Sequence, residues 1–108
     1  MRFYVLDESG LPVLHAQGRR DAQAFLGWAV WMEKAHESGR ARIGRDQVGA
    51  FEVSTVFLGI DYGVRQEGEP LVFETMIFGP CGARIVGRCA SIERAREMHA
   101  HALAEVQR

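Results

Sequence analysis

Three side chains, Asp61, Glu74 and His99, have the chemistry of a hydrolytic or metal-binding site. Asp61 directly follows a strand-like apolar run, and Glu74 interrupts the second such run, LVFETMIF. A carboxylate buried in an apolar run can act as a general acid or base. If a C-terminal helix crosses the strand ends, His99 would complete a carboxylate, carboxylate and imidazole set suited to a metal ion or to hydrolysis.

Each of these residues also has a plainer interpretation, and we favour it. Glu74 is the polar residue of an alternating strand if that face of the sheet is open to water. Asp61 could begin a turn by accepting hydrogen bonds from the backbone, and a single histidine on an apolar helix stripe is usually a core or rim histidine. The sequence has no phosphate-binding glycine loop, G-x-S-x-G or H-E-x-x-H motif. We therefore predict no catalytic residue, metal site or cofactor, and a small hydrolase using these three residues is the alternative.

The densest strand signal lies in residues 51–60 and 71–78, which are rich in β-branched and aromatic residues. A loop of Asp, Gly, Glu and Pro separates them, as expected for a β-hairpin. From Thr55 onward both faces of the first run are largely apolar, and the second run is similar. This pattern is typical of the middle of a sheet, or of a sheet whose outer face is covered by another subunit. We therefore predict a homodimer.

The other expected elements are two short strands, an amphipathic helix that Asp21 caps, a polar linker, a third strand with a bulge at Gly87, and a terminal helix that Ser91 caps. The two short strands are residues 2–6 and 12–16, the first helix is 21–37 and the linker is 40–49. The strand with the bulge is 83–89, and the terminal helix begins at 92. The order strand-strand-helix-strand-strand-strand-helix predicts an α+β fold. We expect a single, mostly antiparallel sheet of about four to five strands with both helices packed on one face. A chain of 108 residues is expected to form a single domain, 1–108.

The formal net charge of −1 provides no basic field, so nucleic acid is not an expected partner. Five arginines near the first helix are interpreted as a solvated rim: Arg19, Arg20, Arg40, Arg42 and Arg45. Cys81 and Cys89 lack metal-ligand spacing and are expected to be reduced thiols. No signal peptide and no run of roughly 18 apolar residues is present, so we expect the protein in the cytoplasm, without a membrane.

Trp28 and Trp31 point about 300° apart on a helix of 3.6 residues per turn, so both cannot be equally deep. Trp28 is expected in the core, whereas Trp31 could cover a second element or form part of a sticky surface. Trp31, Tyr62 and Glu74 are the residues that we expect to contact a partner.

Three segments, VSTVFLGID (53–61), PLVFETMIFG (70–79) and SIERAREMH (91–99), give the chain a resemblance to a family. It resembles a group of short, uncharacterised proteins of bacteriophage and bacterial genomes with the approximate patterns VSTVFLGLDH, PLLFETMVFG and STWEEALAGH. Asp61, Glu74 and His99 match the pattern, whereas Tyr62 replaces a histidine and Ile92 replaces a tryptophan. The resemblance covers a little under half of the chain and implies a phage or prophage setting.

The hypothesis that follows is a small non-enzymatic protein that binds a macromolecular partner, most simply a protein. In a phage setting, an inhibitor of a host defence system, similar in action to an anti-CRISPR protein, fits such a chain.

Overall fold

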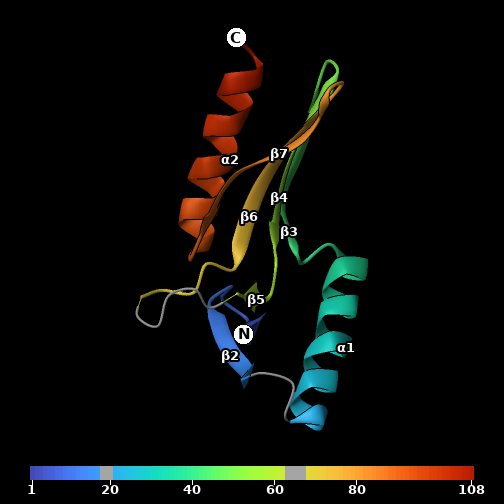
Figure 1. The fold of residues 1–108 in the computed structure, drawn as a ribbon, viewed down its shortest axis with the longest axis vertical. Helices are drawn as coiled ribbons and strands as arrows, with labels where there is room; N and C mark the ends of the chain where they lie inside the picture. The colour runs from blue at the N-terminus through green and yellow to red at the C-terminus, as the bar shows by residue number, and fades with distance from the viewer. Residues whose placement is uncertain (18–20, 63–67) are drawn as a thin grey trace.

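The computed structural model describes residues 1–17, 21–62 and 68–108 and has an α+β fold with two helices and two antiparallel sheets (Figure 1). The small sheet has the order β2-β1-β5, and the large sheet has the order β3-β4-β6-β7. The elements are β1 (Arg2–Leu6), β2 (Pro12–Gln17), α1 (Ala22–Ser38), β3 (Arg42–Val48), β4 (Phe51–Phe57), β5 (Ile60–Asp61), β6 (Phe73–Gly79), β7 (Gly82–Cys89) and α2 (Ile92–Val106). The α+β class is confirmed, but the expectation of a single sheet is wrong.

The sheet divides at Gly59, within what the sequence suggested was one long strand. β4 pairs directly with β6, as expected for the central pair, but β4 ends at Phe57. Gly59 has a φ of 72°, and a Cβ there would lie 2.7 Å from Sδ of Met32, so this position favours glycine. The carbonyl of Gly59 accepts a hydrogen bond from the amide of Tyr4 at 2.8 Å. The chain thus passes from the large sheet to the small one, where β5 pairs with β1.

The segment predicted as a polar linker is largely strand β3, which pairs with β4 along the edge of the large sheet. That prediction was wrong because an edge strand needs few apolar residues, and natural edges commonly carry charges. A register shift between Arg42 and Gly44 adds an irregularity of the kind that also protects edges. The large sheet therefore has four strands.

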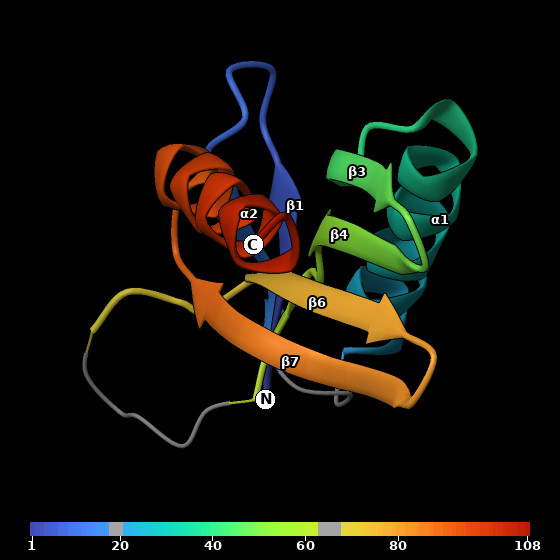
Figure 2. The same ribbon diagram turned by 90° about the horizontal axis from the view of Figure 1, so that it is seen from above.

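The two helices pack on different sheets, so the expectation that both lie on one face is also wrong. α2 contacts β3, β4, β6 and β7, whereas α1 contacts β1 and β2. Figure 2 shows the large sheet curving around α2, and Figure 1 shows α1 at the other end of the molecule, on the side of the small sheet. Nε1 of Trp28 donates to the carbonyl of Tyr4 at 3.0 Å and ties α1 to the small sheet. Among the described residues, no helix covers the side of β6 and β7 that faces away from α2.

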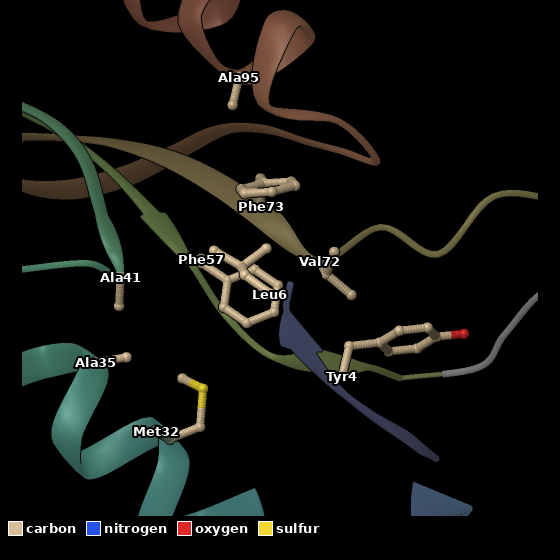
Figure 3. Close-up of a cluster of buried hydrophobic side chains, with 9 residues drawn as sticks. All are labelled: Tyr4, Leu6, Met32, Ala35, Ala41, Phe57, Val72, Phe73 and Ala95. Carbon is tan, nitrogen blue, oxygen red and sulfur yellow. The ribbon is translucent and has the colours of Figure 1, made fainter. Parts of the chain in front are cut away.

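A buried hydrophobic cluster joins both sheets and both helices (Figure 3). The rings of Phe57 and Phe73 lie at its centre, 5.3 Å apart, between α1 and α2. The cluster comprises Tyr4, Leu6, Met32, Ala35, Ala41, Phe57, Val72, Phe73 and Ala95. A second cluster of Val53, Ile77 and Ala102 lies farther along the interface between α2 and the large sheet. Within the described residues, no helix is both long and apolar enough to cross a bilayer.

Candidate functional site

The structure gives Asp61, Glu74 and His99 three different sets of partners. Asp61 lies in β5, where its backbone pairs with Arg2 of β1. Glu74 lies in β6 and pairs with Arg88, whereas His99 lies on the face of α2 that packs on the large sheet. In the part of the chain that the structure describes, no three or more His, Cys, Asp or Glu side chains are grouped so as to hold a metal ion.

His99 is the centre of a hydrogen-bonded chain that links α2 to three strands and is buried except at its outer end, Asp46, whose side chain is 52% exposed. Its Nε2 is 2.7 Å from Oδ2 of Asp46 in β3, and its Nδ1 is 2.7 Å from Oγ1 of Thr55 in β4. Oγ1 of Thr55 is in turn 2.5 Å from Oγ1 of Thr75 in β6. His99 is 8% exposed, and both threonines are fully buried. We call Asp46, Thr55, Thr75 and His99 the polar chain.

Local backbone features bring the polar chain together. Thr55 and Thr75 are directly opposite each other in the antiparallel pairing of β4 with β6, so their hydroxyls meet. Gly44 is opposite Thr55 on the other side, and a Cβ there would lie 2.9 Å from Cε1 of His99. The missing side chain therefore leaves room for the imidazole ring. Asp46, two residues along the same strand, reaches the outer nitrogen of the ring.

The polar chain has the order carboxylate, imidazole, hydroxyl, which in hydrolases activates a nucleophile. A nucleophile must also reach its substrate, and the Thr55 hydroxyl is fully buried between His99 and Thr75. Every buried side-chain nitrogen and oxygen atom in the described residues has a hydrogen-bond partner. The arrangement therefore serves to hold α2 in one position on the large sheet, as satisfied buried networks do.

Asp46, Thr55 and Thr75 were not anticipated as partners of His99. Asp46 was assigned to a linker, and the two threonines were interpreted only as strand residues. The signal that could have indicated them is a threonine on the otherwise apolar inward face of each of two paired strands, together with a histidine on the apolar stripe of a helix. Such a pattern calls for hydrogen bonds inside the core.

Glu74 lies on the side of β6 that faces away from α2, as the favoured interpretation required, but it is only 7% exposed and so is not an ordinary solvated strand residue. Nε of Arg88, directly opposite on β7, donates to Oε2 of Glu74 at 2.8 Å and helps to cover it. The guanidinium of Arg88 also lies over the ring of Tyr62, 5.5 Å from its centroid. Arg88 thus connects two of the three residues expected to contact a partner, Tyr62 and Glu74.

Trp31, the third of these residues, is half-buried and packs beside the core. Its ring packs edge-on against Phe57 at 5.9 Å, and the guanidinium of Arg40 lies 5.7 Å from its centroid. Trp31 therefore covers a second element, which was one of its two expected roles. Of the arginines near the first helix, Arg19 and Arg20 lie outside the described residues.

Two groups elsewhere have shifted pKa values. The Ser9 hydroxyl, with further hydrogen bonds from nearby backbone amides, lowers the pKa of Asp7 at the turn between β1 and β2. Partial burial raises the pKa of the Cys89 thiol, whereas Cys81 is exposed at the turn between β6 and β7.

The β6–β7 hairpin presents an ordered outer surface. Thr75 and Ile77 are buried on the side of α2, so the alternate residues of β6 lie on the opposite side. The β-ladder places three pairs there, Glu74 with Arg88, Met76 with Ile85, and Phe78 with Ala83. Ile85 is 51% and Phe78 is 40% exposed. We call these six residues the outer hairpin face.

The outer hairpin face and the polar chain thus lie on opposite sides of the same strands. The outer hairpin face combines exposed apolar side chains with the ion pair of Arg88 and Glu74, whereas Thr55, Thr75 and His99 of the polar chain are buried and only its outer end, Asp46, reaches solvent. The chain matches no protein-family model, no curated protein and no solved structure.

Proposed function

We propose that the chain binds a protein partner through the outer hairpin face and acts without catalysis. In the phage or prophage setting that the family resemblance implies, the partner is a component of a host defence system in the cytoplasm, and binding inhibits it. The observation that carries this proposal is the exposed apolar part of the outer hairpin face, formed by Phe78 and Ile85 on the side of β6 and β7 that no helix in the described part of the chain covers.

The composition of this face is that of a protein-binding surface. Met, Phe, Tyr and Arg are enriched at interface centres, and Met76, Phe78 and Arg88 occupy the face with Tyr62 beside it. An apolar centre bordered by an ion pair offers both area and orientation to a partner. Charges of both signs on the face are less suited to the uniformly negative backbone of a nucleic acid.

The outer hairpin face is also held rigidly before any partner arrives. β6 lies between β4 and β7 and is paired along its length with both. On its other side, the polar chain and the apolar residues beneath α2 fix the strands. A surface fixed in this way loses little conformational entropy on binding, so more of the contact energy appears as affinity.

A plating assay tests the proposal. A bacterium carrying the defence system expresses the wild-type chain, Ile85→Asp or the control Leu26→Asp, and is infected with a phage that the system restricts. Leu26 is an equally apolar residue, 61% exposed on α1 and remote from the outer hairpin face. We expect the wild type and Leu26→Asp to restore plating of the phage. With Ile85→Asp the efficiency of plating should be at least about tenfold lower than with the wild type, as for loss of an interface anchor.

The same three proteins, tagged, are then used to capture partners from the host. The partner should be retained by the wild type and Leu26→Asp and lost with Ile85→Asp, while the melting temperatures of all three remain close. Equal plating and equal capture by Ile85→Asp and the wild type would refute the proposal.

A further inference from the structure

The outer hairpin face is complementary to itself. Its three rows, from the base of the hairpin to its tip, are Glu74 with Arg88, Met76 with Ile85, and Phe78 with Ala83. Each row contains one residue from β6 and one from β7, and the two are matched in character. The first row pairs opposite charges, and the other two pair apolar side chains.

We propose that a second copy of this chain docks on the outer hairpin face, around a two-fold axis that runs parallel to the strands midway between β6 and β7. A rotation about that axis places β6 of each copy over β7 of the other. Each residue keeps its height along the strands, so the two residues of a row face the same row of the second copy. Met76 then faces Ile85 of the second copy, and Phe78 faces Ala83 of the second copy. The two sheets pack face to face about 10 Å apart with their strands aligned, a common sheet packing.

Charge complementarity supports a second copy as the occupant. The axis brings Arg88 of one copy toward Glu74 of the other, so the two ion pairs form a cluster in which unlike charges are neighbours. Arg88 is suited to this role because its side chain is 37% exposed, whereas that of Glu74 is 9% exposed beneath it. A rotation about an axis along β7 itself would instead place Arg88 over Arg88 of the second copy.

The small area of the contact limits the affinity of the dimer. Two strands of seven and eight residues present a face of roughly 10 Å by 25 Å. Side chains that project from the sheet add to the area that each copy buries, but that area is still well below the roughly 800 Å² per partner of a standard interface. Contacts of this size are typical of weak associations, so the dimer should form only at high protein concentration. A protein that binds the same face with higher affinity displaces the second copy. This competition rests on the proposed function, whereas the self-association does not.

Sedimentation velocity on the purified full chain, from about 20 µM to about 1 mM, tests the association directly. The wild type and Leu26→Asp are expected to sediment faster with rising concentration. Ile85→Asp places a carboxylate in the apolar centre and is expected to weaken association at least about tenfold. Because Ile85 is half exposed, this variant should keep the melting temperature of the wild type.

Cross-linking tests the axis. In a background of Cys81→Ser and Cys89→Ala, a tagged copy with Phe78→Cys is mixed with an untagged copy with Ala83→Cys and a short bis-maleimide. These positions face each other across the axis, so the mixed product should form. The matched control replaces Ala83→Cys by Gln47→Cys, an exposed site on β3 that pairs with Glu52. It lies three strands farther, about 14 Å from the facing position, and should not react.

The outcomes separate this inference from the proposed function. A wild type that stays monomeric at about 1 mM, or equal cross-linking at Gln47 and Ala83, overturns the two-fold docking. If the protein is monomeric while Ile85→Asp still loses plating and capture, the face binds a different protein only, and self-docking is wrong. If the protein dimerises as described but Ile85→Asp plates like the wild type, the dimer stands and the partner-binding function fails.

Discussion

Replacement of Thr55 by valine tests the role of the polar chain, because it keeps the shape of the side chain and removes the central hydroxyl. A carboxylate only accepts hydrogen bonds, so Nε2 of His99 donates to Asp46. In the neutral imidazole, Nδ1 then accepts from Thr55, and Oγ1 of Thr55 accepts from Thr75. Thr55→Val removes both of these bonds and leaves two buried groups without a partner, Nδ1 of His99 and the hydroxyl of Thr75.

The magnitude follows from these two groups. A buried polar group that loses its partner costs about 1–3 kcal/mol, and water cannot reach Thr75, which is fully buried, as readily as it reaches His99, which is 8% exposed. We expect Thr55→Val to lower the free energy of unfolding by about 2–4 kcal/mol. Thr75→Val, at the end of the chain, leaves His99 paired and should cost only about 0.5–1.5 kcal/mol.

Urea denaturation followed by circular dichroism measures both variants against the wild type. The double variant Thr55→Val/Thr75→Val has no orphaned Thr75 hydroxyl, so it should lose less than the sum of the two single changes. A Thr55→Val protein within about 0.5 kcal/mol of the wild type, the range of an ordinary surface substitution, would show that the polar chain does not hold α2 on the sheet.

Three further predictions follow from other contacts. Gly44→Ala forces a methyl group against the ring of His99 and should cost about 1–3 kcal/mol, measured by the same denaturation, and an unchanged midpoint would contradict the close packing. Cys81 should be alkylated by iodoacetamide faster than Cys89 near pH 8, since burial both shields the Cys89 thiol and raises its pKa; equal rates by mass spectrometry would contradict this. The folded-state pKa of Asp7 is below the usual 3.8, so its contribution to stability is present above that pH and is lost as the pH falls through the folded value. Asp7→Asn should therefore remove part of the acid sensitivity of the wild type below about pH 4 in urea titrations, and identical pH profiles would refute the assignment.

The features that the sequence predicted correctly are those determined by residues close together in the chain. Asp21 and Ser91 cap the two helices by accepting from backbone amides three residues on, as their positions before apolar-periodic segments indicated. The bulge near Gly87 appears as a register shift between β6 and β7, and the central pair of strands is directly paired. Side-chain type at one position, or composition over a short run, was sufficient for each.

The features that the sequence did not predict depend on contacts between distant residues. The division of the sheet at Gly59 reflects the approach of Met32 from α1, which no local pattern records. Asp46 and His99 are 53 positions apart, and only the strand order brings them together. The burial of Glu74 was missed for the same reason, because its ion-pair partner Arg88 lies in a strand that follows it.

The alternation of side chains along β6 separates what stabilises the fold from what faces a partner. Thr75 points toward α2 and belongs to the polar chain, so its neighbours Glu74 and Met76 must lie on the outer hairpin face. A change in the polar chain should therefore lower stability without altering the composition of the face, and Ile85→Asp should alter the face with little effect on stability. Because the sites lie on opposite sides of the sheet and share no partner, the effects of Thr75→Val and Ile85→Asp on unfolding should add to within about 0.5 kcal/mol. A larger coupling would mean that the face and the polar chain are not independent, and that loss of binding by Ile85→Asp reflects a change in the fold.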